Sequence, residues 1–348
     1  MTFNSWVGNL KIRSLLFFLI SLVSVFLPQP CDAEWEFNGQ SNIFYTNDVA
    51  LFSATRRLTR HQDPTQPVLD GALAKQGDDV IYEPIAQVSK KFELMGTPLK
   101  VLVRGQGFVF FNKTEYNHGS LGVEVVHKPT PAITLNYGYF FGPNLFLGEN
   151  EVRESEENEV DPPELQDEEF TTHYLATVIE YNFPAEPDMT LRLLGRYGLR
   201  DYDSGFHQRD TKFWTIGTHL EWKLSEKIEM ALGYHYERGL ADGRHQPELR
   251  DDISYYNHFA TGELMIDLTE QVGVEMAVHY EFNGYTTGIE GDERKGEHEN
   301  VVQGDIFTTW KVTDIIELTA GFQAVFRKES FEDRLENYNT WVGGKIIF

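Results

Sequence analysis

The chain of 348 residues carries 54 acidic side chains against 30 basic ones, a formal net charge of −24 at pH 7. This charge excludes nucleic acid as a partner, because the phosphate backbone would be repelled. A mean hydropathy of −0.39 and the lack of an apolar run of about twenty residues beyond the N-terminus also exclude a bundle of membrane-spanning helices. A membrane protein built from strands remains possible.

The N-terminal segment predicts a secretory signal peptide over residues 1–33. Lys11 and Arg13 precede an apolar stretch from Leu15 to Leu27, which is too short to cross a hydrocarbon core of about 30 Å as a permanent anchor. Ala33 is the small residue that signal peptidase favours, so we expect cleavage after it.

Cleavage would also remove the only cysteine, Cys31. A lipid on this cysteine is the alternative, but the preceding Pro28-Gln29-Pro30 lacks the small apolar residues that lipid attachment needs. A mature chain without cysteine excludes disulfides, thiolate metal sites and cysteine nucleophiles. We expect residues 34–348 to form a single barrel domain.

Apolar and polar residues alternate with a period of two along this domain. In residues 228–237 and 272–282 one face is apolar and the other is small or charged. The alternating stretches have about ten to fifteen residues, whereas soluble strands have about five or six and a tilted strand crosses a bilayer with about nine to eleven. Aromatic residues such as Trp222, Trp310 and Tyr280 end the apolar faces, which fits the interfacial girdles of a membrane barrel.

Short turns and longer polar loops separate these stretches in alternation, which is typical of outer-membrane barrels. We expect strands to start near Trp35, Val80, Leu99, Ser120, Ile133, Thr172, Met189, Phe213, Ile228, Tyr256, Val272, Val302, Ile316 and Tyr338. The predicted fold class is therefore all-β, a transmembrane antiparallel β-barrel of about 14 strands with short periplasmic turns and long external loops. A count that is wrong by one hairpin is the alternative.

Three of the short turns repeat along the chain at a spacing of 44 residues, at Ser225-Glu226, Thr269-Glu270 and Thr313-Asp314. The repeating unit is a hairpin with its loop. Hairpin duplication and a spacing dictated by membrane thickness both account for the repeat, and we favour the second.

The C-terminus ends on Phe348, with Gly343 five places and Ile346 two places before it. This pattern resembles the terminal signal by which Gram-negative outer-membrane barrels are recognised by their assembly machinery. As a motif the resemblance covers only these last residues, and as a strand pattern it covers the whole mature chain. It implies a location in the bacterial outer membrane, in contact with lipid and lipopolysaccharide.

The strands also predict which side chains face the barrel interior, because neighbours alternate between lumen and lipid. The inward set is Lys91, Lys100, Arg104, Arg192, Arg196, Arg200, His219, Glu221, Glu229, His235, Glu237, Glu263, Asp267, Glu275, His279, Glu281, Asp305 and Glu317. Bases and acids fall on different arcs of the wall, which creates a transverse field that favours polar solutes. The alternative is that the charges pair and close the lumen.

Fourteen strands predict a narrow channel, because barrels of about eight strands are filled by side chains and those of about sixteen to eighteen are wide porins. The first strand begins immediately after the cleavage site, which leaves no room for the N-terminal plug of the 14-stranded fatty-acid transporters. The chain is more similar to monomeric, unplugged 14-stranded porins, although it carries no motif specific to them.

The first loop, roughly Asp48–Asp79, is a candidate constriction. It carries Arg56, Arg57 and Arg60, which could fold inward against the acidic arc. A solvated external loop and an extension of the first strand through Val49–Leu58 are the alternatives.

The third loop, Glu149–Glu169, is dense in acidic residues. We expect it to be mobile and strongly hydrated. It contains no spacing of the calcium-loop type.

One triplet, His118-Gly119-Ser120, faintly resembles the motif of outer-membrane phospholipases and lipid A deacylases. Leu121 stands where those enzymes have asparagine after the serine. Alternation also directs His118 and Ser120 toward the lumen and away from lipid, so we expect no catalytic residues.

A second constellation, His235 and Glu237 with His279 and Glu281, has the residue types of a metal site. One strand lies between the two pairs, which separates them by about 9.5 Å at a strand spacing of ~4.7 Å. That is too far for one ion, so we expect neither a metal nor another cofactor.

Together these observations predict a monomeric outer-membrane channel for passive diffusion of small hydrophilic solutes or ions. We expect it to prefer cations weakly, because inward acids outnumber inward bases. One alternative is a non-catalytic barrel scaffold that sheaths or anchors a partner protein, marked by an occupied lumen. A third is an outer-membrane lipid hydrolase, marked by an outward His118 and Ser120 pair.

Overall fold

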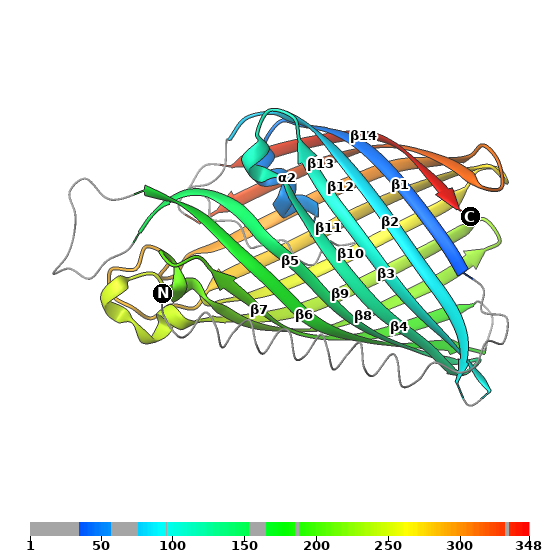
Figure 1. The fold of residues 1–348 in the computed structure, drawn as a ribbon, viewed down its shortest axis with the longest axis horizontal. Helices are drawn as coiled ribbons and strands as arrows, with labels where there is room; N and C mark the ends of the chain where they lie inside the picture. Colours follow the sequence, from blue (N-terminus) through cyan, green and yellow to red (C-terminus); the bar gives the residue numbers. More distant parts are fainter. Residues whose placement is uncertain are drawn as a thin grey trace. The chain divides into compact units, whose positions relative to one another are not determined.

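The structure, a computed structural model, describes residues 35–56, 76–94, 96–152, 165–184, 188–330 and 334–347. Fourteen strands pair in chain order as antiparallel neighbours, and the first strand pairs with the last to close a barrel (Figure 1). This confirms the predicted fold class and the predicted number of strands. The predicted signal peptide lies outside the described residues.

Thirteen strands begin within four residues of the predicted starts, and β6 begins seven residues before the predicted Thr172. They are β1 (Trp35–Thr46), β2 (Asp79–Leu94), β3 (Thr97–Phe110), β4 (His118–Thr130), β5 (Ile133–Glu151), β6 (Leu165–Phe183), β7 (Met189–Tyr202), β8 (Thr211–Ser225), β9 (Ile228–Ala241), β10 (Tyr255–Asp267), β11 (Val272–Tyr285), β12 (His298–Lys311), β13 (Ile316–Glu329) and β14 (Leu335–Ile347). The helical elements are α2 (Val49–Arg56), η2 (Thr114–Tyr116), η4 (His207–Arg209), η5 (Asp242–His245) and η6 (Pro247–Leu249).

Short connections gather at one end of the barrel and longer ones at the other. The short ones are 95–96, 131–132, 184–188, 226–227, 268–271 and 312–315. The longest connection at the other end is 47–78, which contains α2. One connection there is an exception, because 330–334 has the same length as the turn over 184–188. We call the two ends the short-turn end and the long-loop end.

The repeated turns share one local device. Thr313 Oγ1 accepts hydrogen bonds from the backbone N–H groups of Ile315 and Ile316. The hydroxyl oxygens of Thr269 and Ser225 accept equivalent bonds two residues on. A hydroxyl that satisfies the free N–H groups of a tight turn explains why serine or threonine recurs at this position.

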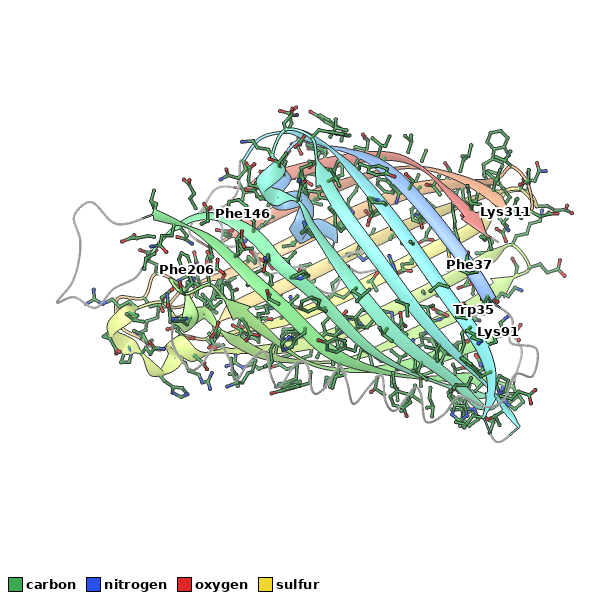
Figure 2. The ribbon with its side chains drawn as sticks, in the orientation of Figure 1. Trp35, Phe37, Lys91, Phe146, Phe206 and Lys311 are labelled. Atoms are coloured by element: carbon green, nitrogen blue, oxygen red, sulfur yellow. The ribbon has the colours of Figure 1, made fainter. Side chains whose placement is uncertain are left out.

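The outer face of the wall is apolar. Val278, Val342 and Leu175 are each more than half exposed and point away from the barrel axis. Trp35 and Phe37 lie on the outer face near the short-turn end (Figure 2). An exterior that exposes so many large apolar side chains is stable in lipid and not in water.

Aromatic side chains also ring the outer face toward the long-loop end. Tyr236 packs against Trp214 and His258, with ring centroids 5.3 and 5.2 Å apart. The Tyr234 hydroxyl oxygen lies 2.7 Å from His258 Nδ1, within hydrogen-bond distance. Amphipathic rings of this kind occupy the membrane–water interface.

The apolar core of the described chain lies inside the barrel, at the long-loop end. Val49, Ala50 and Phe52 of α2 are buried against inward residues of β1, β2 and β3. The ring of Phe52 meets three other rings edge-on, with centroid distances of 5.3 Å to Phe44, 6.0 Å to Phe108 and 6.1 Å to Phe110. We call these four phenylalanines the aromatic cluster.

The position of α2 bears on the alternatives for the first loop. A strand-one extension through Val49–Leu58 is wrong over α2, where the chain is helical. A solvated external loop is wrong for Val49–Phe52, which are buried inside the wall. Among the described residues no helix is long and apolar enough to cross a membrane.

The predicted third loop is shorter than expected. β5 continues to Glu151 and β6 begins at Leu165, so both ends of the segment Glu149–Glu169 are paired strand. Glu168 is almost fully buried. The expectation of hydration is therefore wrong for Glu168, because an arginine of another loop reaches its carboxylate.

Candidate functional site

All residues assigned to the lumen by alternation lie on the inner face of the wall. Along β11, for example, the inward His279 and Glu281 are 1% and 2% exposed, whereas the outward Val278 and Tyr280 are 62% and 44% exposed. The same alternation places Lys100 and Arg104 of β3, Arg192, Arg196 and Arg200 of β7, His219 and Glu221 of β8, His235 and Glu237 of β9, and Glu263 of β10 inside.

Many of these charges pair with neighbours along the wall. Arg192 contacts Glu180 at 2.8 Å and Glu221 at 2.6 Å. Arg200 donates to the Tyr255 hydroxyl at 2.7 Å and lies 3.4 Å from Glu237. These pairs keep the charges against the strands, so the arc of bases on β7 is partly neutralised by acids on the adjacent strands.

Polar side chains on β11–β14 form a continuous hydrogen-bonded chain. His279 Nε2 lies 2.9 Å from Asp305 Oδ2, and Gln323 donates to the other oxygen of Asp305 at 2.6 Å. Asn339 donates to Gln323 at 2.7 Å and to Asn337 at 2.8 Å. Side chains that are linked by hydrogen bonds in this way hold fixed orientations, so this part of the wall is a rigid polar surface.

The histidines of the predicted metal constellation are separated as expected by a side chain of β10. The Phe259 ring lies 5.6 Å from the ring of His235 and 5.8 Å from that of His279, between the two. No group of three or more potential metal ligands occurs within the described ranges.

His235 instead pairs with His219, and their Nε2 atoms lie 2.5 Å apart. A Cβ at Gly217 would fall 2.1 Å from the His235 ring, and one at Gly233 would fall 2.6 Å from the His219 ring. Glycine at these two positions therefore makes room for the pair.

His118 and Ser120 lie on the inner face of β4, and His118 is part of the packing around the aromatic cluster. Its ring stacks on Phe108 with centroids 4.7 Å apart, and its Nδ1 lies 2.8 Å from the carbonyl oxygen of Tyr116. The two side chains therefore do not form the outward pair that is expected of a lipid hydrolase.

A second filled region, which we call the ionic cluster, lies at the long-loop end beside β6–β11. Arg209 donates to Glu168 at 2.7 Å and to Asp251 at 2.8 Å, and Arg294 donates to Asp251 at 2.9 Å. Gln208 adds a bond to Asp251 at 2.7 Å. All five side chains are buried, so loops 203–210, 242–254 and 286–297 are tied together over this side of the barrel.

Burial acts on the pKa of two carboxyls in the loops of the ionic cluster. Burial opposes ionisation of Asp251, but Arg209 and Arg294 outweigh it and lower the pKa of Asp251 below its ordinary value. Burial raises the pKa of Asp210 to about 6, although the backbone N–H of Tyr202 opposes the shift. The two carboxyls therefore respond to acid in opposite directions.

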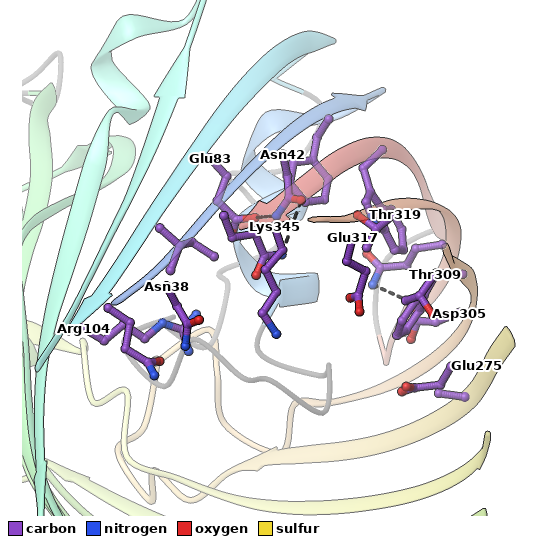
Figure 3. Close-up of a pocket in the computed structure, with 18 of the residues that line it drawn as sticks. Asn38, Asn42, Glu83, Arg104, Glu275, Asp305, Thr309, Glu317, Thr319 and Lys345 are labelled. Carbon is purple, nitrogen blue, oxygen red and sulfur yellow. Dashed lines mark hydrogen bonds between the residues drawn. The ribbon is translucent and has the colours of Figure 1, made fainter. Parts of the chain in front are cut away.

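A cavity of about 500 Å³ opens inside the barrel between β1–β3 and β11–β14 (Figure 3). Its charged residues are the acids Glu83, Glu275, Asp305 and Glu317 and the bases Arg104 and Lys345. Its remaining polar residues are mostly amides, such as Asn38 and Gln87, and Trp341 and Phe307 supply apolar surface. This size and mixture of groups fit a small polar solute.

The predicted constriction residues are only partly visible. Arg56 is the last residue of α2. Arg57 and Arg60 lie outside the described residues. What the structure places inside the barrel is the preceding apolar half of the helix.

The assembly-signal residues lie on β14, except for Phe348, which is outside the described residues. Ile346 faces outward and is 41% exposed. A Cβ at Gly343 would fall 2.0 Å from Asn42 Oδ1, so a glycine is also required here by packing.

Sequence reasoning missed several residues of the interior. They are Glu36, Glu83, Glu168, Arg209, Asp251, Arg294, Arg327, Lys345 and the aromatic cluster. Alternation, applied to every charged residue, predicts Glu36, Glu83, Arg327 and Lys345. No local sequence pattern predicts the contacts of the loop residues, because the partners are far apart in sequence. Arg209 is 41 residues from Glu168 and 42 residues from Asp251.

No protein-family model matches the chain. No curated protein sequence matches it either. Solved structures do match. The outer membrane channel DcaP of Acinetobacter baumannii aligns with a TM-score of 0.54 at 8% identity, over 91% of this chain and 97% of that one.

Two further structures match less well. OmpT, an outer membrane protein of Vibrio cholerae, has a TM-score of 0.48 at 7% identity, over 93% of this chain and 100% of the other. An anion-selective porin from Comamonas acidovorans has a TM-score of 0.45 at 9% identity, over 91% and 99%. The likeness to DcaP is one of fold. With the apolar exterior, it identifies the class: this chain is a membrane-spanning antiparallel β-barrel of 14 strands, with the fold of an outer-membrane channel.

Proposed function

We propose that the protein is a monomeric channel through which small hydrophilic solutes or ions diffuse across the outer membrane. The observation that carries the proposal is the cavity of about 500 Å³, walled by charged and amide side chains from seven strands. A barrel that only anchored itself in lipid would not need a hydrated, charged interior, because burying charges without function costs free energy. The likeness to a channel, DcaP, supports the proposal.

The proposal includes the expected processing and assembly of the chain. Residues 1–33 are removed as a signal peptide, and Gly343, Ile346 and Phe348 direct the barrel to the assembly machinery. The outer aromatic belt contacts lipid and lipopolysaccharide.

We also propose that the channel prefers cations weakly. The cavity has four acids and two bases, a formal excess of two negative charges. Charges lining a narrow passage act over a Debye length of about 8 Å at physiological salt, so the preference should grow as salt is lowered. The acidic residues Glu237, Glu263 and Glu281 add negative charge to the wall of β9–β11.

The reversal potential under a KCl gradient tests this preference. The intact protein should favour potassium, and changing Glu237, Glu263 and Glu281 together to Gln should weaken the preference. The matched control changes three outward or loop carboxylates, Glu226, Glu270 and Glu336, to Gln and should leave the reversal potential unaltered. Anion preference in the intact protein would contradict the proposed weighting of the wall charges.

A scaffold that holds a partner is the second candidate. The aromatic cluster favours it, because α2 occupies part of the lumen at the long-loop end. A scaffold would show no steady conductance, whereas a channel conducts around or beneath α2.

A further inference from the structure

The charges of the cavity are divided between two sides. Arg104 comes from β3 and Lys345 from β14. Glu275, Asp305 and Glu317 come from β11, β12 and β13, and Figure 3 shows them on the other side of the cavity from Arg104. The fourth acid, Glu83 of β2, lies on the side of Arg104 and accepts hydrogen bonds from Asn42 and Gln106. The field across the cavity is therefore set by Arg104 and Lys345 on one side and by the three acids of β11–β13 on the other.

Arg104 on the basic side retains donor capacity. Its Nη2 donates a hydrogen bond to Gln106 Oε1 at 2.9 Å, and Gln106 Nε2 donates one to Glu83 Oε1 at 2.7 Å. Among the described residues Gln106 is the one hydrogen-bond acceptor of Arg104, and the Nε of Arg104 is too deeply buried to reach a solute, so the remaining donors are those of the guanidinium end. A guanidinium with an unused donor is suited to a carboxylate, which it binds through charge-assisted hydrogen bonds.

Lys345 and Glu317 stand opposite each other on β14 and β13. No ion pair joins them within the described ranges, and both point into the cavity (Figure 3). The nearby Asp305 already accepts bonds from Gln303 and Gln323. An ammonium and a carboxylate are thus presented side by side to whatever enters the cavity.

We propose that this cavity is a binding site for a small zwitterion, an α-amino acid or a molecule of like charge pattern. The proposal deepens the channel function and rests on it. The solute carboxylate would lie against Arg104 and Lys345, and its ammonium against Glu317 and Glu275. Trp341 and Phe307 would contact an apolar side chain.

A zwitterion fits this arrangement better than a solute with one charge. A simple cation would leave the Arg104 donors without an acceptor, and a simple anion would meet the carboxylates of β11–β13. A zwitterion aligned with the field satisfies both sides with no net charge transferred into the barrel. The cavity would then select by charge pattern rather than by charge alone.

The test measures block of the ion current through the purified full-length protein in planar bilayers. The probes are leucine, leucine methyl ester as the cation alone, and N-acetyl-leucine as the anion alone. Leucine should reduce the current at a concentration about tenfold lower than either analogue, the factor expected for one additional charge-assisted hydrogen bond.

Two variants assign the two ends of the solute. Arg104→Gln should remove the advantage of leucine over leucine methyl ester, and Glu317→Gln should remove its advantage over N-acetyl-leucine. Arg238→Gln, on the outer face of β9, is the matched control and should leave the order of the three probes unchanged.

The possible outcomes separate the two proposals. Steady current with leucine methyl ester or N-acetyl-leucine as the strongest blocker would overturn the zwitterion site and leave the channel intact. Steady current with no block by leucine would do the same. If no current flows, the channel function fails, and calorimetry on detergent-solubilised protein decides the site: leucine binding that weakens in Arg104→Gln supports it, and no binding overturns it.

Discussion

The aromatic cluster and the ionic cluster fill the same end of the barrel interior by opposite chemistry. Beneath α2, Phe52 meets three other phenylalanines. Beside β6–β11, Arg209 meets Glu168 and Asp251, and all three side chains are buried. The apolar cluster depends on shape and size, whereas the ionic cluster depends on every partner being present and ionised.

The largest effect is expected from Arg209→Ala. Removing one partner leaves the buried carboxylates of Glu168 and Asp251 uncompensated, which should destabilise the closed arrangement of the loops by about 3–5 kcal/mol. Hydrogen exchange measured by mass spectrometry should rise in loops 203–210, 242–254 and 286–297.

The control for that change is Arg244→Ala, because Arg244 is partly exposed and lies 4.0 Å from its acidic partner, Asp242. Arg209→Lys should be intermediate, since an ammonium keeps the charge but not the fork that spans two carboxylates. Equal exchange in the intact protein and in Arg209→Ala would show that the cluster does not hold the loops.

The pH dependence of hydrogen exchange in the same loops is a second test of the ionic cluster. The pKa of Asp251 lies below its ordinary value of 3.8, so its stabilising ionisation is complete above that value and is lost as pH falls through the lowered one. Asp210, with a pKa of about 6, acts oppositely, because protonation below that value favours the folded loop. The contribution of Asp210 grows as pH falls from about 6 to 3.8, and that of Asp251 is lost only below 3.8, so exchange corrected for its chemical pH dependence should be slowest at about pH 4 and rise at lower pH.

A smaller effect is expected from Phe52→Ala, at about 3 kcal/mol for loss of a buried ring from the aromatic cluster. It should loosen α2 and raise the single-channel conductance, with no dependence on pH in this range because no charged group is removed. Phe111→Ala is the control, since that ring is 60% exposed. Unchanged conductance in Phe52→Ala would mean that α2 does not narrow the path.

The contrast between the clusters also explains what could be predicted from the sequence. The barrel and its inward residues follow from a local rule, the alternation of side chains along a strand, so Arg192 or Glu281 could be placed without knowing any partner. The pairing register of neighbouring strands adds little uncertainty to this prediction, because a shift by one residue would turn every apolar side chain of a strand away from lipid.

The loops follow no such rule. Val49–Phe52 is apolar, and as a short run it fits a strand extension as well as a helix. Only the barrel interior, which supplies phenylalanines from β1 and β3, decides for the helix. Glu168 was expected to be hydrated because its neighbours in sequence are acidic, but Arg209 of another loop buries it. Such contacts depend on tertiary structure, which a single sequence does not encode locally.

The central claim is that the interior conducts. A planar-bilayer recording of the purified full-length protein tests it most directly. We predict steady, ohmic single-channel currents in KCl. A correctly folded, heat-modifiable barrel that inserts into the bilayer and passes no current would contradict the claim.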